Sequence, residues 1–162
     1  WGGAMSAQQI GLMDALNAGN YNAIDRDKCN TPEEKEQAAK DSMFADFFLT
    51  GANGLSLDGE MVNIDGTGNR VAAMIHGPRQ VVAVVGVNKL VEGGIQQAIA
   101  RIKRDACPPN ARRLGLPTPC GTTGKCNAAA CESGFCNVIT IQEHPTGKRP
   151  YHVVLVNEAL GY

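Results

Sequence analysis

Residues 80–88, with the sequence QVVAVVGVN, form a continuous apolar run that is rich in valine. A strand has this pattern when both of its faces are buried, because the side chains that alternate to either side must then all be apolar. Strands of this kind are typical of parallel sheets, whose two faces are covered by helices. The run therefore predicts a buried parallel sheet.

Strand-like and helix-like segments alternate along most of the chain. The Asp58-Gly59 pair lies between two short apolar segments and predicts a hairpin turn. Thr31 and Pro32 stand where a helix would have its N-cap and its first residue. Strands are predicted at residues 46–50, 55–64 (a hairpin), 80–88, 137–143 and 151–158, and helices at 6–19, 30–45, 69–76 and 93–106. The alternation predicts an α/β fold with a mostly parallel sheet.

The composition narrows the class of protein. The chain has 162 residues, of which 43% are hydrophobic and 19% charged, which predicts one globular domain over residues 1–162. The net charge of −1 shows no basic excess and argues against a nucleic-acid partner. No apolar run reaches the ~20 residues that a membrane-spanning helix needs, so we expect no membrane partner. The chain begins inside a turn pattern, WGG, which predicts that further sequence precedes Trp1.

A glycine-rich turn, DGTGNR, connects a predicted strand to a predicted helix. Gly66 and Gly68 let a ligand approach the backbone, and the free N–H groups of a first helical turn favour an anion. Arg70 would add a bidentate contact to a carboxylate or phosphate, and Asp65 would bind a ligand hydroxyl or hold Arg70. The turn has neither the G-x-G-x-x-G fingerprint nor the end of a Walker A loop. The alternative is a tight connection in which Thr67 caps the helix.

Further polar residues and a second glycine-rich turn, WGGAMS, stand at predicted strand or helix ends. Taken singly, each fits ordinary turn chemistry. Because the carboxyl ends of parallel strands share one edge of a sheet, open α/β sheets bind their ligands there. We therefore expect one crevice for a small anionic metabolite. The candidate ligand-binding residues are Gly2, Gly3, Asn53, Asp65, Gly66, Thr67, Gly68, Asn69, Arg70, Asn88 and Lys89.

The loop-rich region 107–136 carries four closely spaced cysteines. They are Cys120, Cys126, Cys131 and Cys136, in the pattern C-x5-C-x4-C-x4-C. This pattern matches neither the paired C-x2-C knuckles of a zinc ribbon nor the run of bacterial ferredoxins. Four thiols on a flexible loop can still surround one metal ion or cluster; two disulfides, or reduced thiols without a metal, are the alternatives. We interpret Cys29 and Cys107, which lie outside the pattern, as ordinary small buried residues.

Several longer stretches stand out together: WGGAMS, LTGANGLSLDGEMVNIDGTGNRVAAMIHGP, VVGVNKLV, TPCGTTGKC, FCN and VLVNEALGY. In this order, and over nearly the whole chain, they resemble the LUD-domain family, which includes the lactate-utilization proteins related to the LutC and YkgG subunits. DGEMVNIDGTGNRVAA is the most specific of them. Ala4 stands where the family usually has a serine. In the cysteine-bearing branch of the family the pattern is C-x5-C-x2-C-x6-C, so Ala129 occupies the third cysteine position and Cys131 follows two residues later.

The resemblance implies a single LUD domain with a fold similar to the NagB/RpiA/CoA-transferase group, a three-layer α/β/α sandwich with a mostly parallel sheet. It also implies that the family's residues before WGG are missing here. The matching candidate residues would line the crevice at the strand carboxyl ends.

The resemblance further implies a cytoplasmic bacterial protein of lactate or 2-hydroxyacid utilization. Its four cysteines would bind an iron–sulfur cluster, or zinc as the alternative. It would be an accessory subunit of L-lactate oxidation beside other lactate-utilization subunits, or a homo-oligomer. An independent transferase or isomerase acting on a CoA thioester or sugar phosphate is one rival reading. A non-catalytic module with a zinc- or disulfide-stapled loop is the other. No catalytic residue is assigned.

Overall fold

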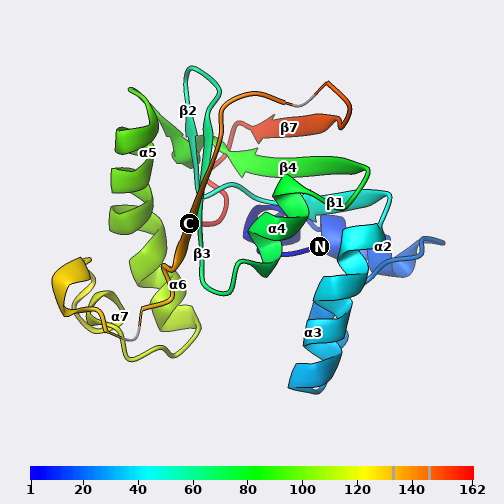
Figure 1. Cartoon of the computed structure of the whole chain (residues 1–162), viewed down its shortest axis with the longest axis horizontal. Helices are drawn as coiled ribbons and strands as arrows, with labels where there is room; N and C mark the ends of the chain where they lie inside the picture. The colour runs from blue at the N-terminus through cyan, green and yellow to red at the C-terminus, as the bar shows by residue number, and fades with distance from the viewer. Residues whose placement is uncertain (133, 146) are drawn as a thin grey trace. The chain divides into compact units, whose positions relative to one another are not determined.

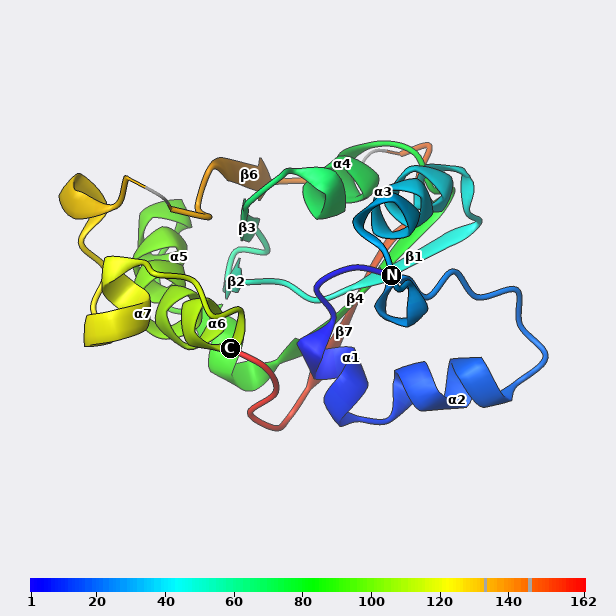
Figure 2. The same cartoon turned by 90° about the horizontal axis from the view of Figure 1, so that it is seen from below.

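The computed structural model describes residues 1–132, 134–145 and 147–162. These residues group into two compact units, between which the chain passes several times. Unit 1 comprises Trp1–Gly51, Asn69–Val87 and Pro145–Gly161, and unit 2 comprises Ala52–Gly68, Asn88–His144 and Tyr162. Figure 1 and Figure 2 show the course of the chain from two directions. A single domain over the whole chain stays a prediction.

Unit 1 is built on a parallel sheet of three strands. The strands are β1 (Phe47–Thr50), β4 (Gln80–Gly86) and β7 (Tyr151–Val156), in the order β1-β4-β7. The valine run forms β4, which is paired on both sides, and Val81 and Val85 in it have no exposed surface. The prediction of a buried strand in a parallel sheet is therefore confirmed.

The helices of unit 1 follow the predicted segments with one break. They are α1 (Met5–Gln9), α2 (Leu12–Ala18), α3 (Pro32–Asp41) and α4 (Asn69–Ile75), with short 3-10 turns at Arg26–Lys28 and Ser42–Phe44. The single helix expected at residues 6–19 is wrong, because Gly11 adopts a left-handed φ of 75° and separates α1 from α2. The cap of α3 is as predicted: Thr31 and Glu34 form a reciprocal capping box, and Pro32 is the first helical residue.

Unit 2 has a mixed sheet of four strands. The strands are β2 (Gly54–Ser56), β3 (Met61–Asp65), β5 (Leu90–Val91) and β6 (Val138–Gln142), in the order β5-β2-β3-β6. β2 and β3 form the antiparallel hairpin that Asp58-Gly59 predicts. β6 pairs antiparallel with β3, and β5 pairs parallel with β2. The strands expected at residues 137–143 and 151–158 therefore belong to different sheets.

The helical part of unit 2 extends further than expected. It contains α5 (Ile95–Arg101), a π turn (Ile102–Ala106), α6 (Cys107–Arg113), α7 (Pro119–Thr123) and a 3-10 turn (Ala128–Ala130); another 3-10 turn, Val87–Lys89, precedes β5. The region 107–136, expected to be loop-rich, thus contains the short helices α6 and α7. Pro108 and Pro109 have no N–H to donate and their rings crowd the preceding turn, and the wider π turn lies directly before them.

Helices together with parallel and antiparallel strands confirm the α/β class. The arrangement as a three-layer sandwich stays a prediction. Among the described residues, no helix is both long and apolar enough to span a bilayer.

Candidate functional site

The glycine-rich turn WGGAMS lies at the carboxyl end of β1 in unit 1. Gly2 pairs in a parallel bridge with Thr50, the last residue of β1, and its N–H donates to the Leu49 carbonyl at 3.2 Å. The Thr50 hydroxyl donates to the Gly2 carbonyl at 3.0 Å. The sequence WGG is therefore fixed at a strand carboxyl end, the place where α/β sheets bind ligands.

The Arg70 side chain packs against this turn. A Cβ built on Gly2 would lie 3.6 Å from Arg70 Cγ, and one built on Gly3 would lie 2.6 Å from Arg70 Cδ. Arg70 stands at the second position of α4, is only 8% exposed, and has its Nη1 3.7 Å from the sulfur of Met74. The structure thus brings four candidate residues together in unit 1: Gly2, Gly3, Asn69 and Arg70.

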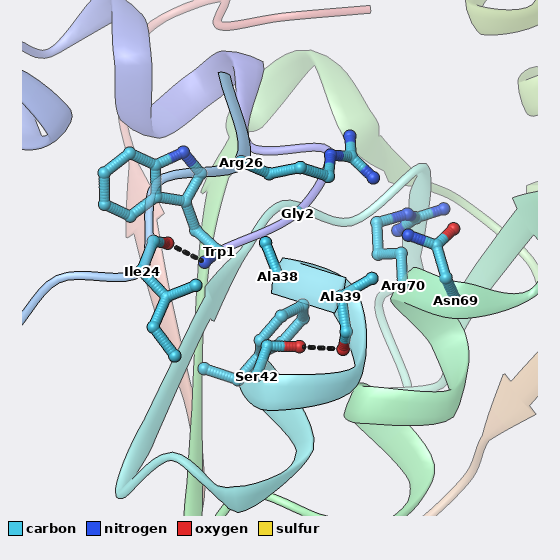
Figure 3. Close-up of a pocket in the computed structure, with 10 residues that line it drawn as sticks. Trp1, Gly2, Ile24, Arg26, Ala38, Ala39, Ser42, Asn69 and Arg70 are labelled. Carbon is cyan, nitrogen blue, oxygen red and sulfur yellow. Dashed lines mark hydrogen bonds between the residues drawn. The ribbon is translucent and has the colours of Figure 1, made fainter. Parts of the chain in front are cut away.

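A small cavity of about 10 Å³ lies beside Arg70. Its lining residues are Trp1, Gly2, Ile24, Arg26, Ala38, Ala39, Ser42, Phe48, Asn69 and Arg70. In Figure 3 the guanidinium groups of Arg26 and Arg70 lie at the same end of the cavity, and the Asn69 amide lies next to Arg70. None of the described residues that line it is acidic. The space fits one water-sized group, such as an oxygen of an anion.

Arg26 is a lining residue that the sequence reasoning missed. It begins the short 3-10 turn Arg26–Lys28, in which Asp25 accepts a hydrogen bond from the Asp27 N–H at 2.9 Å. Nothing in its neighbourhood resembles a binding motif, so no sequence signal pointed to it. Four residues that line the cavity also line a larger hollow of about 760 Å³. The shared residues are Trp1, Ile24, Ser42 and Phe48.

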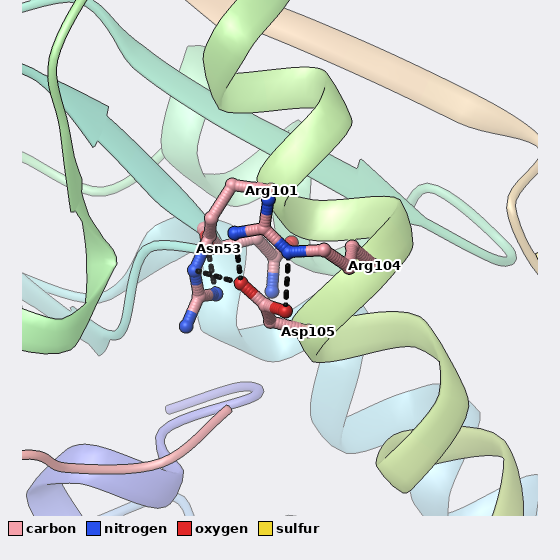
Figure 4. A network of polar contacts seen from close by, with 4 residues as sticks. All are labelled: Asn53, Arg101, Arg104 and Asp105. Atoms are coloured by element: carbon pink, nitrogen blue, oxygen red, sulfur yellow. Dashed lines mark hydrogen bonds and ion pairs between the residues drawn. The ribbon is translucent and has the colours of Figure 1, made fainter. Parts of the chain in front are cut away.

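Asn53, a candidate ligand residue, is bonded within unit 2. Its side-chain oxygen accepts from the Ile64 N–H at 3.0 Å, and its own N–H donates to the Asn63 side chain at 3.2 Å. Its carbonyl accepts from Arg101 Nη1 at 2.9 Å, as Figure 4 shows. These bonds join the residue before β2 to β3 and to α5, so the observed contacts of Asn53 are structural.

Arg101 belongs to a small charged network on the helical side of unit 2. It is 6% exposed, and burial lowers its pKa. Asp105 lies 3.8 Å from Arg101 Nε and accepts two hydrogen bonds from Arg104, at 2.8 and 2.7 Å. The bonds from Arg104 are the main cause that lowers the pKa of Asp105.

The Asp65–Gly68 turn is held by the end of the cysteine-bearing region. Asp65 Oδ1 accepts from the Gly68 N–H at 2.9 Å, which closes the turn on itself. Asn137 donates from its backbone to the Asp65 carbonyl at 2.9 Å and from its side chain to the Gly66 carbonyl at 3.1 Å. A Cβ on Gly66 would lie 3.3 Å from the Phe135 carbonyl, so the glycine allows this close approach.

The candidate residues are thus divided between the two units. The residues of unit 2 are Asn53, Asp65, Gly66, Thr67, Gly68, Asn88 and Lys89, and those of unit 1 are Gly2, Gly3, Asn69 and Arg70. In unit 2, Asn88 is half-buried and Lys89 is 3% exposed. A single crevice lined by all eleven stays a prediction.

The four cysteines of the pattern have different surroundings. Cys120 is buried in the core of unit 2 and lies 3.3 Å from the Thr118 hydroxyl. Cys126 is exposed, whereas Cys131 and Cys136 are half-buried. All of them are free thiols in the structure. Burial raises the pKa of Cys131, helped by the neighbouring thiols.

Cys136 meets a cysteine from outside the pattern. Its sulfur lies 3.4 Å from that of Cys107, the first residue of α6, which is buried as predicted. The hydrogen bond with Cys107, together with the charge of Lys103, lowers the pKa of Cys136 to about 7. The same bond, with burial, raises the pKa of Cys107. Either sulfur can be the donor in this contact. Sequence reasoning missed this contact because it joins residues 29 positions apart.

The four cysteines of the pattern do not form a metal-binding group among the described residues. Zinc and iron–sulfur sites need several donors around one centre, with Zn–S bonds of about 2.3 Å. Among residues 1–132, 134–145 and 147–162, no three Cys, His, Asp or Glu side chains come close enough to hold one ion. Only one contact between two of the thiols is observed among these residues, that of Cys107 with Cys136. The iron–sulfur cluster and zinc stay predictions of the sequence.

The two sheets with their helices define an α/β protein, in which unit 1 has an arginine-lined cavity beside a glycine-rich turn. A family model, the LUD domain, matches residues 1–156. The chain therefore belongs to the LUD-domain family. Neither a curated protein nor a solved structure matches it.

Proposed function

We propose that this LUD-domain protein binds a small carboxylate metabolite in unit 1, through Arg70 and Arg26, and serves lactate or 2-hydroxyacid utilization. The observation that carries the proposal is the cavity beside which the guanidinium groups of Arg26 and Arg70 lie. The planar fork of a guanidinium matches a carboxylate, and charge-assisted hydrogen bonds of this kind are among the strongest in proteins. Membership of the LUD-domain family supports the choice of lactate.

In this proposal each of these residues has a role in binding. The Gly2–Gly3 turn at the end of β1 leaves room for the Arg70 side chain, because a Cβ at either glycine would come close to it. Arg70 and Arg26 bind the carboxylate, of which one oxygen fits the cavity. The amide of Asn69, beside Arg70, donates to or accepts from the 2-hydroxyl of the ligand. No catalytic step is assigned to these residues.

The protein acts in this proposal as a binding subunit. The thiols of unit 2 take no part in this proposal. Other lactate-utilization subunits would supply the oxidation of L-lactate.

Isothermal titration calorimetry with L-lactate and pyruvate tests the proposal. The Arg70→Gln protein should bind roughly tenfold to a hundredfold more weakly, because hydrogen bonds to a charged group contribute about 1.5–3 kcal/mol. Arg70→Lys keeps the positive charge but not the planar fork, so its affinity should lie between those of the wild type and Arg70→Gln. Lys40→Gln, which removes an exposed positive charge from the same unit, should bind like the wild type. Equal affinity in a folded Arg70→Gln protein would refute the proposal.

A further inference from the structure

Two cysteines that are distant in the sequence lie in contact in unit 2. Cys107 begins α6, and Cys136 stands two residues before β6. Their sulfurs are 3.4 Å apart and both are free thiols. This separation is about 1.4 Å longer than an S–S bond of about 2.05 Å. A small shift of either side chain would therefore bring the two sulfurs to bonding distance.

The two thiols differ in their access to solvent. Cys107 is 4% exposed and sits among the buried apolar residues of the unit, with Ile102 and Ala111. Cys136 packs on the same cluster from its edge and is half-buried. Cys136 is therefore the more accessible residue of the pair to a reagent in solution. The pair therefore consists of a half-buried thiol, Cys136, and a buried thiol, Cys107.

The other thiols of the region are placed differently. Cys120 contacts the Thr118 hydroxyl, at 3.3 Å, and Cys126 is exposed. Cys131 lies against Gly134, where an added Cβ would be 2.9 Å from its sulfur. Contact between two sulfur atoms thus singles out Cys107 and Cys136 among the described cysteines.

We propose that Cys107 and Cys136 are a redox-active dithiol that closes to a disulfide by exchange with a low-molecular-weight disulfide, such as glutathione disulfide. The Cys136 thiolate attacks one sulfur of the reagent; a mixed disulfide forms and one glutathione thiolate leaves. Cys107 then loses its proton to solvent and attacks the Cys136 sulfur, which releases the second glutathione. Two protein thiols are oxidised and one reagent disulfide is reduced to two thiols.

The pair is adjacent to the segment that holds the glycine-rich turn. Asn137, which follows Cys136, donates to the carbonyls of Asp65 and Gly66. Phe135, which precedes Cys136, has its own carbonyl close to Gly66. A Cys107–Cys136 bond fastens this segment to the start of α6. Oxidation therefore alters the anchoring of the Asp65–Gly68 turn.

Mass spectrometry of the whole chain tests the pair. The reduced protein, freed of reductant, is incubated with glutathione disulfide, and its intact mass and non-reduced peptides are measured. We expect one cross-linked peptide pair, Cys107 with Cys136, and a loss of about 2 Da from two hydrogens. Cys126→Ser, which removes the exposed thiol, should give the same cross-link. Cys107→Ala should instead keep a stable glutathione adduct on Cys136.

Several results would overturn the proposal. A lasting adduct on Cys136 in the wild type would show that Cys107 does not resolve it. A cross-link from Cys136 to Cys120, Cys126 or Cys131 would show that another thiol is its partner. Stoichiometric iron or zinc in protein purified without oxygen, with Cys136 protected from glutathione disulfide, would show that the thiol serves a metal. The wild-type peptides decide these cases even if Cys107→Ala does not fold.

Discussion

Gly3 shows how one backbone position shapes the arginine-lined cavity of unit 1. Its φ of +58° lies in the left-handed region, which L side chains rarely adopt. A Cβ there would also come 2.6 Å from Arg70 Cδ and 3.0 Å from Arg70 Nε. Two constraints therefore require glycine at position 3: the left-handed φ of the turn and the close approach of the Arg70 side chain.

Gly3→Ala should weaken lactate binding by displacing the Arg70 side chain. Gly11→Ala is the matched control, because Gly11 also has a positive φ, of 75°, but an added Cβ there meets no atom within 4 Å. Both variants should lose about 1–2 kcal/mol of unfolding free energy through backbone strain. Only Gly3→Ala should reduce the affinity seen by calorimetry. Equal affinity losses in the two variants would mean that the clash with Arg70 is irrelevant.

Asn53 and Asp65 show what the sequence could not predict about single residues. Both follow or end strands, as expected, but their side-chain oxygens accept backbone N–H groups of Ile64 and Gly68. A polar residue at a strand end has the same pattern in sequence whether it bonds its own chain or a ligand. Arg70, by contrast, was identified as a candidate through its position behind a glycine-rich turn, and it does line a cavity.

At the scale of elements, Arg149 caps the carboxyl end of α4. Its guanidinium donates to the carbonyls of Ala73, Met74 and Pro78, at 2.6, 2.6 and 2.5 Å. The last carbonyls of a helix have no partner within the helix, and a cation there also suits the helix dipole. Arg149 therefore ties the segment before β7 to the end of α4, the helix that begins with Asn69 and Arg70.

Arg149→Met should lower the free energy of unfolding by about 1.5–3 kcal/mol, because three carbonyls lose a charged donor. Urea denaturation of the purified protein measures this. The neighbouring Lys148 is exposed, and Lys148→Met should change stability by less than about 0.5 kcal/mol. An equal loss of unfolding free energy in both variants would show that net charge, and not the hydrogen bonds of Arg149 to the end of α4, causes the effect.

The charged network on α5 and the following π turn gives a pH dependence. The hydrogen bonds from Arg104, and then the charge of Arg101, hold the pKa of Asp105 below its usual value. A carboxyl whose pKa is lowered by folding stabilises the native state above its unfolded pKa of about 3.9, and this contribution disappears as the pH falls through the folded pKa. The contribution is small because Asp105 is partly exposed.

Asp105→Asn should therefore have a slightly lower melting temperature than the wild type at pH 7. The difference should shrink as the pH falls below about 4, where the wild-type carboxyl becomes protonated. Thermal unfolding followed by circular dichroism from pH 3 to 7, with a ~0.15 M salt background to limit long-range effects, measures it. A difference that is constant over this range would exclude an electrostatic origin.

At the scale of the whole molecule, the sequence predicted the class of fold and the buried strand, but not how the strands divide into sheets. The valine run predicts β4 because a strand with both faces buried has apolar side chains on both sides. β6 and β7 follow one another in the sequence, yet β6 pairs with β3 and β7 with β4. Strand pairing depends on contacts between distant residues, which periodicity does not reveal. The Cys107–Cys136 contact was missed for the same reason.

Binding of a carboxylate by Arg70 is tested most directly by NMR of the arginine side-chain Nε–H groups during a titration with L-lactate. The resonances are assigned with Arg70→Lys, Arg26→Lys and Arg104→Lys. We predict that the signals of Arg70 and Arg26 shift with one shared dissociation constant, while that of Arg104, which bonds Asp105 in unit 2, stays in place. An unchanged Arg70 signal at saturating lactate would contradict the proposed function.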